Sequence, residues 1–476
     1  MSLQKLSAAM GNQLWVNINL EFEFHASRKT KDQITLSRDF ISFLAKQVVL
    51  SCSRAERQLN ALDLANILLK YANLETDLHH VNAADEDSWL WVLRATNHQW
   101  SYLRLPSSIL GRYVYLFEHI FADGDLKKQI NESLDIGLFD LLKIGISIFA
   151  GFAPLTDGRL QSTSFQISRY TNTKIEVLKP LLTRENFDKF FDVFAADKQR
   201  FLKVNKRYRL ADPLLKKYEF NALKRYPIII TDSDKDDEKY IIPSLADFLY
   251  ATTEGLYYVL LDRLPKDQKE KFFRILGEVF EVYVGELIMF YNIDLFSRAR
   301  LIREQIYRVG RNEVRSADWL LVSDQTIFQI ECKKRKLNSY AKAGVESKDG
   351  KGIKAFLKNV AEELDKLCKK EDHIRQGLLN EIKYGGQKFI NIITYLDEMF
   401  SINQYGRNEI KKHMKNEGGA FYILGCWEFE LLCQHSKDRT LDLVRALKDL
   451  MSNRTEIYSI EFLDNIYKDF FESLMG

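Results

Sequence analysis

Two acidic side chains and a lysine in the C-terminal half of the chain have the types and spacing of a metal-assisted hydrolytic site. Asp318 is followed by Glu331, and Lys333 comes two residues after that glutamate. Two carboxylates can hold Mg²⁺ or Mn²⁺, which keep water and substrate phosphate as their remaining ligands. Such an ion would lower the pKa of a bound water, while Lys333 would orient that water or neutralise the transition state. The three residues therefore predict hydrolysis of phosphodiester bonds.

A hairpin of two strands is expected to position these side chains. Residues 316–322 form a short apolar stretch, and residues 326–333 form a second stretch after a Ser-Asp-Gln turn. Side chains alternate across a strand, so Glu331 and Lys333 should share one face while their neighbours point into an apolar layer. Antiparallel pairing would bring Asp318 close to Glu331, because both lie at the end of the hairpin away from the turn. A cation between the two carboxylates would offset the cost of burying them.

The acid-x-lysine sequence pattern occurs readily by chance, so its interpretation depends on the surrounding secondary-structure elements. A helix expected over residues 272–291 would place Glu278 and Glu281 on one face, because they are three residues apart. The elements expected after the hairpin are one helix and two strands, over residues 353–370, 389–395 and 421–425.

This order of elements resembles the PD-(D/E)XK, or restriction-endonuclease-like, nuclease superfamily. The resemblance implies that Asp318 and Glu331 bind the metal ion and that Lys333 is the catalytic lysine. It further implies that Glu281 supplies an additional acid to the metal from the first helix. Glu278 is an alternative for this last role, and the sequence leaves that choice open.

One departure from the family pattern is Ala317, which stands where the family name has proline, a position that varies widely. An interpretation without catalysis also exists. Glu331 and Lys333 would then form a surface ion pair on the strand, and Asp318 would cap a turn.

A basic segment follows the hairpin. The chain as a whole has a formal charge of only +3, but residues 298–370 contain 18 Lys/Arg and 10 Asp/Glu. A polyanionic partner fits such a local surplus. We therefore expect nucleic acid as the partner, with contacts from Lys334, Arg335, Lys336 and Lys354.

The remaining pattern predicts an α+β multidomain protein. Residues 1–155 are expected to form a strand, at 16–24, followed by a helical domain that includes a helical segment at 59–71. Residues 156–270 are expected to be mostly helical, with two short strands on either side of an acidic run at 232–238. Residues 271–476 are expected to form the restriction-endonuclease-like α/β domain with a central mixed sheet.

Cysteine usage and hydropathy favour a cytoplasmic protein without a membrane partner. The five cysteines show no paired spacing, and the N-terminus lacks the pattern of a secretory signal. The longest apolar stretch, residues 141–155, is too short to span a bilayer and carries Lys143. A buried helix is expected there.

Three functions remain open at this point. The first is a Mg²⁺-dependent (or Mn²⁺-dependent) endonuclease acting on DNA, and the second is a ribonuclease, with transfer RNA among its conceivable substrates, that uses the same site. The third is a non-catalytic nucleic-acid-binding protein. A large helical region before such a nuclease is similar to single-chain bacterial anti-phage effectors, which by analogy implies a phage-derived trigger, and homodimers are common among related folds.

Overall fold

The computed structural model describes most of the chain in two compact units. The first unit comprises residues 1–80, 102–272 and 463–476, and the second comprises residues 81–101 and 273–462. The described residues are 38–51, 106–151, 164–165, 167–173, 176–210, 219–230, 240–296, 298–334, 351–398, 402–416, 418–439, 443–444, 447 and 460–475.

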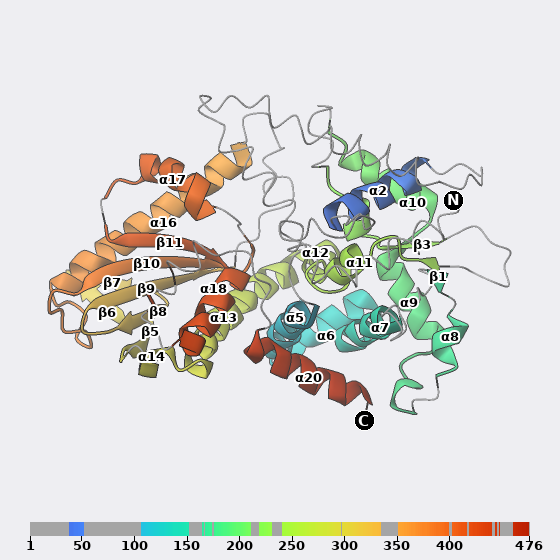
Figure 1. Cartoon of the computed structure of the whole chain (residues 1–476), viewed down its shortest axis with the longest axis horizontal. Helices are drawn as coiled ribbons and strands as arrows, with labels where there is room; N and C mark the ends of the chain where they lie inside the picture. Colours follow the sequence, from blue (N-terminus) through green and yellow to red (C-terminus); the bar gives the residue numbers. More distant parts are fainter. Residues whose placement is uncertain are drawn as a thin grey trace, which may run out of the picture. The chain divides into compact units, whose positions relative to one another are not determined.

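The second unit is built on a mixed sheet of five strands in the order β11-β10-β9-β8-β5 (Figure 1). Strands β9, β10 and β11 are mutually parallel, whereas β8 is antiparallel to both β9 and β5. A separate hairpin, β6 with β7, lies in the sequence between β5 and β8. The strands are β5 (Arg300–Arg303), β6 (Ile306–Val309), β7 (Asn312–Arg315), β8 (Trp319–Val322), β9 (Thr326–Lys333), β10 (Lys388–Tyr395) and β11 (Ala420–Gly425).

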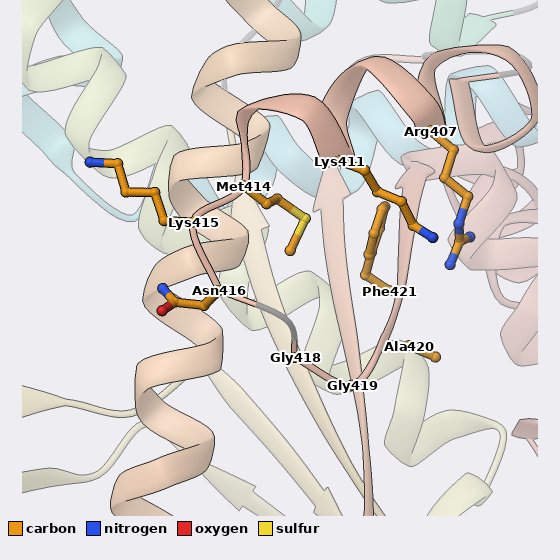
Figure 2. Close-up of a pocket in the computed structure, with 9 residues that line it drawn as sticks. All are labelled: Arg407, Lys411, Met414, Lys415, Asn416, Gly418, Gly419, Ala420 and Phe421. Carbon is orange, nitrogen blue, oxygen red and sulfur yellow. The ribbon is translucent and has the colours of Figure 1, made fainter.

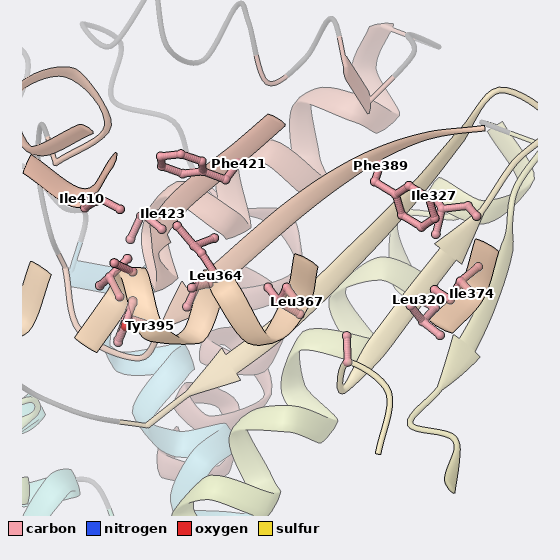
Figure 3. Packing of buried hydrophobic residues seen from close by; sticks show 14 of the residues in the cluster. Leu320, Ile327, Leu364, Leu367, Ile374, Phe389, Tyr395, Ile410, Phe421 and Ile423 are labelled. Atoms are coloured by element: carbon pink, nitrogen blue, oxygen red, sulfur yellow. The ribbon is translucent and has the colours of Figure 1, made fainter. Parts of the chain in front are cut away.

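Helices cover both faces of this sheet. Helix α16 (Lys351–Arg375) packs Leu364, Leu367 and other apolar residues against Ile327 and Phe389 of the strands (Figure 3). On the opposite face, Trp319 of β8 packs against α13. The other helices of this part are α14 (Ile293–Phe296), the π-helix η7 (Ile402–Gly406), α17 (Arg407–His413) and α18 (Cys426–Arg439). Helix α13 (Lys266–Phe290) belongs to this unit from residue 273 onward, and its residues 266–272 belong to the first unit.

The first unit is mainly helical, with a small sheet in the order β1-β4-β3-β2. Its core is rich in phenylalanine side chains, such as Phe187, Phe190 and Phe194 of α9, which are fully buried. Its strands are β1 (Ser164–Phe165), β2 (Ala195–Ala196), β3 (Ile228–Ile230) and β4 (Tyr240–Ile241). Its helices are α2 (Arg38–Ser51), α5 (Pro106–Ile120), α6 (Gly124–Leu134), α7 (Leu138–Gly151), α8 (Ser168–Thr171), η4 (Glu176–Leu178), α9 (Arg184–Phe194), α10 (Lys198–Arg207), η6 (Ala222–Lys224), α11 (Leu245–Thr252) and α12 (Leu256–Arg263), and α20 (Glu461–Met475) has residues in both units.

The predicted α+β class, the helical N-terminal region and the mixed sheet are confirmed. The hairpin β8–β9 and the strands β10 and β11 form where the apolar alternation placed them. The two short strands of the middle region, β3 and β4, are also present and pair antiparallel. Residues 141–151 of the apolar stretch are part of α7, whose side chains are largely buried, and residues 152–155 lie outside the described ranges.

Helix propensity and tertiary contacts decide three further elements. Residues 266–270 form the first turns of α13, since Lys, Glu and Gln favour helix. Strand β2 lies between α9 and α10, and it pairs with β3. The apolar region around Cys426 and Cys433 is helix α18.

Several predictions fall on residues outside the described ranges. These are the strand at 16–24, the helical segment at 59–71, the acidic run at 232–238, and the side chains of Arg335 and Lys336. Among the described residues, no helix is both long and apolar enough to cross a membrane.

The close contact between α13 and the indole ring of Trp319 predicts that position 285 requires glycine. A Cβ atom at Gly285 would collide with the rigid indole ring, whereas one at Gly277 of the same helix would meet only the flexible end of Lys334. We expect Gly285→Ala to lower the free energy of unfolding by about 1–3 kcal/mol, despite the better helix propensity of alanine. Gly277→Ala is the matched control and should leave stability unchanged or slightly higher, as measured by urea unfolding. Equal stability of the two variants would contradict this packing.

Candidate active site

The first acid of the candidate site is held at the point where β8 begins. The main-chain oxygen of Asp318 accepts a hydrogen bond from the amide of Glu304 (2.8 Å). Its carboxylate Oδ2 accepts a second one from the amide of Cys332, at 2.6 Å. The side chain is therefore fixed against the C-terminal end of β9, where Glu331 and Lys333 lie.

Glu331 and Lys333 lie on the same face of β9, as the alternation predicted, and this face is turned toward α16. Lys333 Nζ lies 2.9 Å from Glu331 Oε1 and 3.0 Å from Glu363 Oε2 of the helix. Lys370 of the same helix approaches the other oxygen of Glu331, Oε2, at 3.1 Å. The side chain of Glu331 is only 12% exposed, so both of its oxygens are engaged in a largely buried charge network.

Sequence reasoning did not identify Glu363 and Lys370. Both lie on α16, and their separation of two helical turns places them on one face of that helix. This spacing was readable in the sequence. Many other charged residues of the same helix have similar spacing, however, and only the packing of α16 on the sheet distinguishes this pair.

The acid contributed by α13 is Glu281, which lies close enough to act on the site electrostatically. Its main-chain oxygen accepts a hydrogen bond from Trp319 Nε1 at 2.8 Å. Burial, followed by the nearby charges of Glu304 and Glu331, raises the pKa of the Glu281 carboxyl. Glu278, in contrast, is exposed and paired with Arg274 at 2.8 Å. The structure thus places Glu281 nearer to the site than its alternative.

Asp318 has the most perturbed carboxyl of the site. Burial, with the negative charge of Glu331 as the second cause, raises its pKa to about 7. No lysine or arginine of the described residues forms an ion pair with it. The group is therefore poised between its charged and neutral forms near neutral pH, and a nearby cation would favour the charged form.

Lys333 is held in its charged form. Burial by itself would lower its pKa, but the carboxylates of Glu331 and Glu363 outweigh burial and hold the pKa above its usual value. A lysine in this state cannot act as a general base near neutral pH. It can stabilise negative charge or orient a water molecule.

Of the four residues predicted to contact nucleic acid, Lys334 and Lys354 lie in the part of the chain that the structure describes. Lys334 packs beside Gly277 of α13, and burial lowers its pKa while Glu281 and Glu278 act in the opposite direction. Lys354 lies half-buried near the start of α16.

The donor set suits a hard cation that retains water ligands. Among the described residues, no group of three or more His, Cys, Asp or Glu side chains is arranged to hold a metal ion. The carboxylates of Asp318 and Glu331, with Glu281 near them, match Mg²⁺, which is often bound by one or two carboxylates plus water and phosphate. Since both oxygens of Glu331 are paired with lysines, an entering ion would have to replace one of these ion pairs.

The raised pKa of Asp318 predicts a stability change in metal-free buffer. The folded carboxyl titrates near pH 7 and the unfolded one near its ordinary value of 3.8, so stability falls as the pH rises through this window. Asp318→Asn removes this loss. We expect the variant to be more stable than the wild type by about 1–3 kcal/mol at pH 8, with little difference near pH 4.

Thermal and urea unfolding in EDTA at the two pH values would measure the effect. Asp324→Asn changes an exposed acid in the turn of the same hairpin and serves as the control. A loss of stability in Asp318→Asn at pH 8 would show that the carboxylate is already compensated in the metal-free protein.

Comparison with known proteins leaves this description of the site unchanged. No protein-family model, curated protein or solved structure matches the chain. The function proposed for the site therefore depends on the geometry of the described residues.

Proposed function

We propose that the chain is a Mg²⁺-dependent nuclease that hydrolyses phosphodiester bonds of DNA. The observation that carries the proposal is the meeting of Asp318, Glu331 and Lys333 at the C-terminal end of β9. The order of α13, β5, β8, β9, α16 and β10 around a mixed sheet supports it, since this order resembles that of restriction-endonuclease-like domains.

Each residue of the site has a distinct role in this proposal. Asp318 and Glu331 would hold the ion, with Glu281 as an additional acid. The ion supplies a water of lowered pKa and stabilises the charge that develops on the phosphate. Lys333 presents a permanent positive charge to that phosphate, and Glu363 fixes the direction in which its ammonium group points.

Lys370 has a supporting role at the other oxygen of Glu331. Its ammonium group also lies 3.1 Å from the main-chain oxygen of Ser316, two residues before Asp318. It therefore connects the beginning of β8 with the end of β9. In the metal-free state it offsets part of the negative charge that an ion would offset in the active enzyme.

Substitution of the three central residues tests the proposal directly. We expect Asp318→Asn, Glu331→Gln and Lys333→Met each to lower cleavage of DNA in Mg²⁺ or Mn²⁺ by about 10²–10³-fold, because each removes charge stabilisation from the transition state. Supercoiled plasmid and end-labelled DNA and RNA strands would be used as substrates, with Asp324→Asn as the control. Cleavage that persists in all three variants would refute the site, and cleavage of RNA alone would reassign the substrate.

Proton release from Asp318 predicts a pH-dependent affinity for the metal. The ion and a proton compete for a carboxyl whose pKa is about 7, so affinity should fall by up to about tenfold for each pH unit below that value. Binding of Mn²⁺ followed by electron paramagnetic resonance, without substrate, would measure this dependence. Asp318→Asn should bind weakly at every pH. A pH-independent affinity of the wild type would show that Asp318 is not a ligand.

A further inference from the structure

A basic pocket lies at the opposite end of the same sheet from the candidate active site. It has a volume of about 630 Å³ and is formed between α17 and the start of β11 (Figure 2). The side chains that bear on the argument are Arg407, Lys411, Met414, Lys415, Asn416 and Phe421.

The lining of this pocket is positively charged and contains no carboxylate. Arg407, Lys411 and Lys415 contribute three cations, and none of them forms a salt bridge with any described residue. Glu409, the acid of α17, pairs instead with Lys412 at 3.1 Å and with His413 at 3.4 Å. The positive charges of the pocket are therefore available to an anion.

One of the two cations that face the pocket, Arg407, is held in position by an aromatic ring. The guanidinium of Arg407 lies 4.3 Å from the centre of the Phe421 ring, a cation–π contact that fixes its plane. Figure 2 shows Arg407 and Lys411 extending from α17 toward Phe421, whereas Lys415 extends away from them. An anion in the pocket would be contacted mainly by the first two residues.

The wall of the pocket is fixed by two buried acids of α16. The carboxylate of Asp365 accepts hydrogen bonds from the amides of Lys415 and Asn416, both at 2.9 Å. Glu371 accepts one from the amide of Gly419 at 3.2 Å. These hydrogen bonds hold the main chain of the wall at Lys415, Asn416 and Gly419. The pocket is thus preformed.

The sheet register separates this pocket from the candidate active site. Ala420 at the start of β11 is in register with Ile390, which is in register with Phe328 of β9. Lys333 lies five residues further along β9, or about 16 Å at 3.3 Å per residue. A nucleic-acid strand several nucleotides long can cover this distance.

We propose that the pocket binds one nucleotide unit of the substrate strand, several nucleotides from the scissile bond. Arg407 and Lys411 contact its phosphate. Met414 and Phe421 supply apolar contact. This inference rests on the proposed nuclease function, because it takes the strand to be the substrate.

Binding without cleavage tests the proposal. Labelled single-stranded DNA of about twelve nucleotides would be titrated by fluorescence anisotropy in EDTA, between about 50 and 200 mM NaCl. Lys411→Gln should weaken binding about three- to tenfold and reduce the slope of log affinity against log salt by about one. Lys412→Gln removes the same charge from the neighbouring residue, which pairs with Glu409 outside the pocket, and should change neither quantity more than about twofold.

The remaining outcomes are distinguishable. Equal affinities of Lys411→Gln and the wild type, with both folded by circular dichroism, would overturn the proposal. The proposal would also be overturned if Lys411→Gln weakened the binding of free AMP but left the binding of the DNA strand unchanged. The pocket would then bind a free nucleotide. The binding assay contains no divalent ion, so its result does not depend on cleavage. If strand binding depends on Lys411 but the protein cleaves no nucleic acid, the pocket proposal stands and the proposed nuclease function is refuted.

Discussion

The parallel pairing of β9 with β10 depends on a buried chain of polar side chains. Gln329 Nε2 donates to Asn391 Oδ1 at 2.9 Å across the two strands and also approaches the main-chain oxygen of Leu367. Asn391 in turn donates to Glu371 of α16 at 2.7 Å. A shift of one residue between the strands would leave these buried groups unpaired and would turn Glu331 and Lys333 to the other face. The same contacts fix α16, which carries the partners of both residues.

The surroundings of the candidate site disfavour the charged form of Asp318. Asp318 is buried next to Glu331 without an ion-pair partner among the described residues, while the two lysines near it both neutralise Glu331. A site that lacked function would be better filled with apolar residues of similar size. Uncompensated charge of this kind is a common property of sites that bind an ion or a charged transition state.

Much of the sheet could be predicted from the sequence, because alternation of apolar residues is a local signal. The β8–β9 hairpin and the shared face of Glu331 and Lys333 follow from it directly. The partners Glu363 and Lys370 could not be predicted, because their role depends on which face of α16 meets the sheet. The basic pocket was missed for a similar reason. Its cations belong to α17 and the turn that follows, and Arg407 and Lys411 converge on Phe421 only after folding.

Successive turns of helix α16 contact the candidate active site at one end of the sheet and the basic pocket at the other end. Glu363 and Lys370 reach the candidate active site, while Asp365 and Glu371 hold the wall of the basic pocket. Adding or removing one residue between them would rotate the rest of the helix by about 100° and separate at least one pair from its partners. The spacing between Glu363 and Glu371 is therefore fixed, whereas exposed positions of α16 can vary. Among divergent relatives, insertions and deletions should fall outside residues 363–371.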